Sequence, residues 1–113
     1  MLSQERRISQ SLFAQILKAG LSFQTQKLSL RICPRKDQRK SAFSFVIPVK
    51  AVKTAIGRNF LKRRGRHVIK KHLADIKEGY LCAFFLRKEM AGLPFPVFEQ
   101  EILAVLKTAN LLQ

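Results

Sequence analysis

Apolar residues along this chain follow two spacings, one typical of helices and one typical of strands. From Ile8 onward they recur at positions i, i+4, i+5, i+8 and i+9, as on the buried stripe of an amphipathic helix. In 42–47 they alternate instead, so that Phe43, Phe45 and Ile47 point to one face of a strand. The expected helices span 8–19, 55–76 and 96–111, and the expected strands lie within 22–33, 42–47 and 80–87.

The strands predict a layered fold. The second face of 42–47 is interrupted by Ser44, so we expect one face of the sheet under helices and the other as a semi-exposed floor. The stretch 80–87 is so apolar that we expect it in the centre of the sheet. The stretch 22–33 fits two short strands or one interrupted strand, so the pattern allows an α/β or an α+β layer. We expect the α+β fold with the order αβββαβα, a small four-stranded sheet with helices packed on it, as a single domain over 1–113.

The amino-acid composition gives the chain a large positive net charge. The chain has 22 Lys and Arg against 7 Asp and Glu, a net charge of +15 and a pI of about 10.8. With 47% hydrophobic residues it can form a packed core, which excludes a wholly disordered basic tail. A folded domain this basic typically binds nucleic acid, and less often an anionic membrane surface.

A membrane partner has little support. The longest apolar run, 80–86, has seven residues, whereas a membrane span needs about 20. The segment after Arg6 and Arg7 is broken by Ser, Gln and Lys, unlike a signal peptide. We therefore expect a cytoplasmic protein with no membrane partner.

No group of residues has the pattern of a catalytic or metal site. Cys33 and Cys82 lie far apart without a CxxC motif, which is typical of free, partly buried thiols. His67 and His72 are five residues apart, on different helix faces, and neither has an obvious carboxylate partner. The acids are scattered, so the chain is interpreted as a binder without chemistry of its own.

The charge is concentrated in 50–72, which holds nine Lys or Arg and no acid. At 100° per residue, five donors fall within about 100° of one another on a helix. We call them the phosphate row: Asn59, Lys62, Arg63, Arg66 and Lys70. The residues expected to pack against the sheet form a second stripe, which lies about 200° from the phosphate row around the helix axis. We call it the packing stripe. Its members are Leu61, Gly65, Val68 and His72.

The row has the geometry of a phosphate-binding surface. Its members rise about 4.5–6 Å per step, comparable with phosphate spacing along a strand, and Arg offers a planar fork to phosphate oxygens. A merely solvated face would mix charges of both signs. Gly65 costs about 1 kcal/mol of helix propensity, so we expect it to allow close approach of the helix to the sheet.

The stretch GRNFLKRRGRH resembles the signature of the bacterial ribonuclease P protein component. Further similar segments are Gly20 to Phe23 after the first helix, FSFVIPVK before the basic stretch and GYLCAFFLRK after it. The matching signature residues are Arg58, Asn59, Lys62, Arg63 and Arg66. The chain departs from the family pattern at Ala51, Lys53, Phe60 and His67, and Phe60 replaces a usual Arg.

The resemblance implies a small partner of a catalytic RNA, ribonuclease P RNA, whose holoenzyme removes the 5′ leader of precursor tRNA. Magnesium would be held mainly by the RNA, and the protein would be monomeric apart from it. The implied fold has a left-handed βαβ crossover, against the usual right-handed preference. The implied RNA-binding residues are Lys50, Lys53, Arg58, Asn59, Lys62, Arg63, Arg66 and Lys70, and the candidates for a leader-binding cleft are Phe13, Leu17 and Phe45.

Two other functions fit the pattern of residues. One is a non-catalytic structural RNA-binding module, such as a ribosomal protein of similar fold. The other is a DNA-binding regulator, although only Asn59 among the basic residues is a typical base reader, and no helix precedes it at turn distance.

Overall fold

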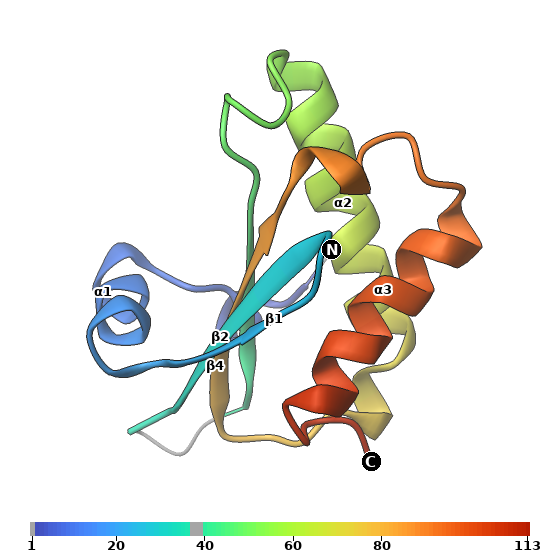
Figure 1. Cartoon of the computed structure of the whole chain (residues 1–113). Helices are drawn as coiled ribbons and strands as arrows, with labels where there is room; N and C mark the ends of the chain where they lie inside the picture. Colours follow the sequence, from blue (N-terminus) through green and yellow to red (C-terminus); the bar gives the residue numbers. More distant parts are fainter. Residues whose placement is uncertain (1, 37–39) are drawn as a thin grey trace.

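The structure, a computed structural model, describes residues 2–36 and 40–113 and has the expected α+β order (Figure 1). The polar, charged stretch 34–41 is expected to form an exposed hairpin loop, and its residues 37–39 lie outside the described residues. The helices are α1 (Gln10–Ala19), α2 (Ala55–Lys71) and α3 (Phe95–Thr108), and the strands are β1 (Leu21–Gln24), β2 (Leu28–Pro34), β3 (Ala42–Val46) and β4 (Tyr80–Leu86). Three short 3-10 helices are η1 (Gln4–Arg6), η2 (Leu73–Asp75) and η3 (Lys88–Met90).

The four strands form one mixed sheet in the order β1-β2-β4-β3. β4 pairs antiparallel with β2 and parallel with β3, so the predicted central position of 80–87 is confirmed. The parallel pair requires a crossover, and α2 supplies it between β3 and β4. This connection places the basic helix directly against the sheet.

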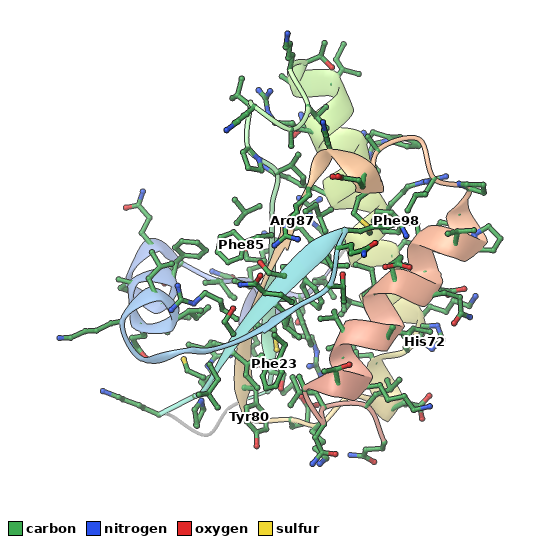
Figure 2. The ribbon with its side chains drawn as sticks, in the orientation of Figure 1. Phe23, His72, Tyr80, Phe85, Arg87 and Phe98 are labelled. Atoms are coloured by element: carbon green, nitrogen blue, oxygen red, sulfur yellow. The ribbon has the colours of Figure 1, made fainter. Side chains whose placement is uncertain are left out.

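The two faces of the sheet have different covers, with α1 on one side and α2 and α3 on the other (Figure 1). Phe45, Phe84 and Leu30 pair across the strands and share the face under α2 and α3, where they join the main core. On the other face Ile16 of α1 packs against Leu81. In Figure 2, Phe85 lies on the α1 side, while Phe23 and Phe98 lie on the other.

α2 begins where the sequence predicts and ends earlier than expected. Thr54 caps it, because its Oγ1 accepts a hydrogen bond from the Gly57 N–H at 3.1 Å. The helix ends at Lys71, not at Ile76. The reason is the C-terminal tail, whose Leu111 carbonyl accepts from the Lys77 N–H at 2.8 Å and whose Gln113 N–H donates to the Asp75 carbonyl at 2.7 Å.

Two glycines lie where a helix meets the sheet. Gly20 follows α1 directly in an extended conformation, with a φ of −76°, and leads straight into β1. Gly65 confirms the expected close approach, because a Cβ there would lie 2.6 Å from atoms of the Phe45 ring. Since van der Waals contact between carbons needs about 3.5–4.0 Å, only Gly lets α2 sit this close to β3.

A polar clamp fixes the N-terminal segment to the sheet. Arg6 is buried, and its two terminal nitrogens donate to the two carboxylate oxygens of Glu78 at 3.0 and 2.8 Å. The Ser41 N–H also donates to Glu78, at 2.9 Å. The hydrogen bond from Arg6 is the main reason that the pKa of Glu78 lies below its usual value. The clamp holds Arg7 against the edge of β3, where it bridges to Phe43.

No helix within 2–36 or 40–113 is both long enough and apolar enough to cross a membrane.

Candidate nucleic-acid interface

The phosphate row lies on the solvent side of α2, as the helical spacing predicted. Lys62 is half-buried and the other four members are exposed. The opposite side is buried through Leu61, Gly65, Val68 and Ile69. The predicted packing stripe was therefore right in three positions, but Ile69 takes the place expected for His72, which caps the helix.

The row is uncompensated by protein carboxylates. Within the described part of the chain, no Asp or Glu forms an ion pair with any of its members. A hollow of about 370 Å³ lies among Arg63, Arg66, His67 and Lys70. A concave group of cations without counter-charges favours an anionic ligand.

Glu99 marks the end of this uncompensated region. Its Oε2 lies 3.0 Å from His72 Nε2 and 3.0 Å from Lys71 Nζ. These contacts, the one with His72 first, hold the pKa of Glu99 below its usual value. The expectation that neither histidine has a carboxylate partner was therefore wrong for His72, because α3 brings a residue from 27 positions away.

The turn before α2 extends the positive surface. Lys50 and Lys53 are both exposed there. Arg58 is half-buried, and its Nη1 donates to the Val52 carbonyl at 2.8 Å, so it also holds the turn against the helix. The N-terminus of α2 adds the positive end of the helix dipole to these cations.

A second basic hollow, of about 360 Å³, lies where the N-terminal segment, β3 and α2 meet. Its cations are Arg7, Lys62 and Arg66, and Phe45 forms part of its wall. Sequence reasoning missed Arg7. Nothing in the local pattern could have found it, because only the clamp between Arg6 and Glu78 brings it to this position.

The other face of the sheet is partly exposed beside α1. We call it the open sheet face, and it combines Ser22, Gln24, Ser29, Arg31, Ser44, Val46 and Phe85. Phe13 of α1 lies against it, with its ring centroid 6.1 Å from that of Phe85 and tilted by 58°. Leu17 is 47% exposed beside it, and its carbonyl accepts from Arg31 Nη2 at 3.4 Å. The structure thus brings Phe13 and Leu17 together.

Phe45 does not join them, because it faces the opposite side of the sheet. It is 6% exposed, and its ring stacks on Phe84 at 4.7 Å and 8°. Grouping Phe45 with Phe13 and Leu17 in one cleft was therefore wrong. The predicted semi-exposed floor is confirmed at Ser44, and the same alternation could have identified its missed neighbours, Phe85 and Arg31.

The described residues offer no metal-binding cluster, since no three His, Cys, Asp or Glu side chains come together within 2–36 and 40–113. Cys33 and Cys82 are buried, and burial raises the pKa of both thiols, which keeps them protonated and weakly nucleophilic.

Comparison with known proteins agrees with the geometry. The family model described as Ribonuclease P matches residues 1–110. A ribonuclease P protein component from Helicobacter acinonychis is 34% identical over 74 residues, which are 66% of this chain and 48% of that protein, so the match spans about half of that relative. One from Streptococcus pneumoniae is 29% identical over 102 residues, covering 89% of this chain and 80% of that protein.

Solved structures share the fold. The RNase P protein of Staphylococcus aureus superposes with a TM-score of 0.87 at 21% identity, covering 98% of this chain and 100% of that one. The protein from Thermotoga maritima gives 0.81 at 23% identity, covering 90% and 96%.

Proposed function

Because the chain belongs to the ribonuclease P protein family, we propose that it is the protein subunit of a ribonuclease P, an RNA-based endoribonuclease that matures the 5′ end of tRNA. The observation that carries the proposal is the phosphate row, a line of donors on α2 that no carboxylate of residues 2–36 or 40–113 pairs with. In this proposal the polypeptide binds ribonuclease P RNA and precursor tRNA, and the RNA holds the magnesium.

The two surfaces bind different RNA molecules. The phosphate row and the adjoining Lys50, Lys53 and Arg58 bind the backbone of the ribonuclease P RNA, because Arg and Lys pair with phosphate oxygens. The open sheet face binds the single-stranded 5′ leader, because its Phe85 ring and polar neighbours suit unpaired bases. Phe13 forms the wall of that site on α1.

Reconstitution tests the proposal. The protein is added to a transcript of a bacterial ribonuclease P RNA at low magnesium, and removal of the 5′ leader from a precursor tRNA is measured. We expect stimulation, because a basic protein replaces part of the magnesium that neutralises RNA phosphates. Failure to stimulate cleavage, with RNA binding intact, would favour the structural RNA-binding module instead.

A matched pair of variants tests the surface. Arg66→Ala should weaken binding of the ribonuclease P RNA by roughly tenfold, as expected for one hydrogen-bonded ion contact. Lys107→Ala, an exposed change in the last turn of α3, should leave it unchanged. The row holds four cations beside the neutral Asn59, and neutralising four phosphates of a single strand predicts a slope of log K against log salt of about −2.8. A slope near zero would refute the role of the phosphate row.

The same proposal places the protein in the cytoplasm, as a monomer within its complex with RNA.

A further inference from the structure

An aromatic surface flanks the phosphate row on α2. Phe60 is 51% exposed, although it lies in the middle of a highly charged helix. Ile56, one turn before it, is 85% exposed. Single exposed apolar side chains are ordinary, but the Phe60 ring shares Arg64 with a second aromatic ring, that of the half-buried Phe95 at the start of α3.

The Arg64 side chain is held in a fixed position next to the rings of Phe60 and Phe95. The Arg64 guanidinium carbon lies 4.9 Å from the centroid of the Phe60 ring and 5.6 Å from that of Phe95. Its Nη1 donates to the Leu93 carbonyl at 2.7 Å. These contacts pre-order a flat cation between aromatic rings, so that an incoming planar group would not have to immobilise it.

A hollow opens between these groups. It measures about 270 Å³ and is lined by Phe60, Arg63, Arg64, His67 and Phe95. The His67 ring meets the Phe95 ring edge-on at 5.5 Å. Pockets for drug-sized ligands measure about 300–1,000 Å³, so this hollow suits a single ring system. Its walls are aromatic or planar, which favours a flat occupant.

The hollow lies beside the phosphate row, so a flat group bound in it can belong to a nucleotide whose phosphate the row binds. At 100° per residue, Phe60 and His67 lie about 40–60° around α2 from Arg63, which also belongs to the phosphate row. A nucleotide whose phosphate is bound by Arg63 therefore has its base within reach of Phe60. Bases stack on aromatic rings and on guanidinium planes without any requirement for a particular sequence.

We propose that the hollow between Phe60, Arg64 and Phe95 is a stacking site for one unpaired nucleobase of the ribonuclease P RNA. The proposal rests on the proposed function, and it adds a base contact to a helix otherwise assigned to phosphates. The site lies across the sheet from the open sheet face, so it is separate from the surface proposed for the leader. The departure at Phe60 thus exchanges an ionic contact for a stacked one.

Binding of a ribonuclease P RNA transcript to substituted proteins tests the site. Phe60→Ala and Phe60→Leu should both weaken binding by roughly 5- to 150-fold, the range for loss of one base–aromatic stack. Phe60→Tyr should restore it, because the aromatic face is kept. The matched control is Leu21→Ala, which removes a 66% exposed side chain from β1, at the sheet edge away from α2. Phe60→Leu binding as tightly as the wild type would overturn the proposal.

A fluorescent reporter gives a second readout that folding defects do not imitate. The chain contains no Trp, so Phe60→Trp carries the only indole signal. Stacking of a base should quench that signal when RNA is added, whereas Ala104→Trp on the exposed side of α3 should change little. An unquenched indole at position 60 in an RNA-bound protein would overturn the proposal.

These binding measurements distinguish failure of the proposed stacking site from failure of the proposed function. If Arg66→Ala weakens binding and Phe60→Leu does not, the stacking site fails and the proposed function stands. If the wild-type protein does not bind ribonuclease P RNA, both fail together.

Discussion

The close approach of α2 to the sheet gives a quantitative prediction for Gly65→Ala. The added Cβ would lie 2.6 Å from ring atoms of Phe45, about 1 Å less than van der Waals contact allows. Phe45 cannot swing away, because it is buried and stacked on Phe84 at 4.7 Å. The helix must therefore move outward or the stack must break.

The expected change in the free energy of unfolding combines two opposing contributions. Overpacking of a well-packed core costs about 1–3 kcal/mol, and the buried Phe45 ring, stacked on Phe84, places this site in the upper part of that range. Replacing Gly by Ala within a helix returns about 1 kcal/mol of propensity. We expect the free energy of unfolding to fall by about 1–2 kcal/mol, measured by urea denaturation with an unchanged m value.

A double-mutant cycle isolates the overlap. Phe45→Leu alone should destabilise the protein, since it removes a buried ring, but it also frees the space that the new methyl group needs. In the double variant the two losses should therefore not add, and the coupling should be about 1 kcal/mol or more. Ala104→Gly, an exposed change in α3, measures the propensity term separately. Strictly additive losses would refute the close-contact explanation of Gly65.

Further predictions concern pH and the two sides of α2. Glu78 and Glu99 have lowered pKa values in the folded protein, so the stability that they contribute is present above the ordinary glutamate pKa of about 4.3 and is lost as the pH falls through the lowered values. Urea midpoints should therefore fall below about pH 4.3, and Glu78→Gln should reduce the decline; an unchanged pH profile in this variant would contradict the clamp. Val68→Ala should cost about 1–4 kcal/mol of stability, because it empties a buried site. Arg63→Ala should lower RNA affinity and leave the urea midpoint unchanged. If this variant instead unfolds, and its folded molecules bind RNA as tightly as the wild type, the two sides of α2 are assigned wrongly.

The elements that the sequence predicted well are those decided by local physics. Arg63 and Arg66 need solvent and Val68 needs burial, so the rotation of α2 follows from the spacing of its residues alone. The alternation in β3 separates Phe45 from Ser44 in the same way. Neither pattern says which face of the sheet α1 will cover, and for that reason Phe45 is a cleft candidate from the sequence although it faces α2 and α3 in the structure.

Contacts between distant segments could not be predicted. Arg6 and Glu78 are 72 residues apart, and His72 meets Glu99 only because α3 packs beside α2. Such pairs depend on the order of strands and on the path of the connections, which a single sequence does not contain. The hollow beside Phe60 belongs to the same class, because Phe95 reaches it from α3.

The central place of β4 has a consequence for how the chain is made. Every other strand of the sheet precedes β4 in sequence, and both β2 and β3 pair with it, so the sheet cannot close until Leu86 has been synthesised. By then the whole basic helix has already been synthesised, before the central strand of the surface on which it packs. A product terminated before Tyr80 would be a cationic, unfolded peptide, not a smaller RNA-binding domain, because long-range pairing is what completes this fold.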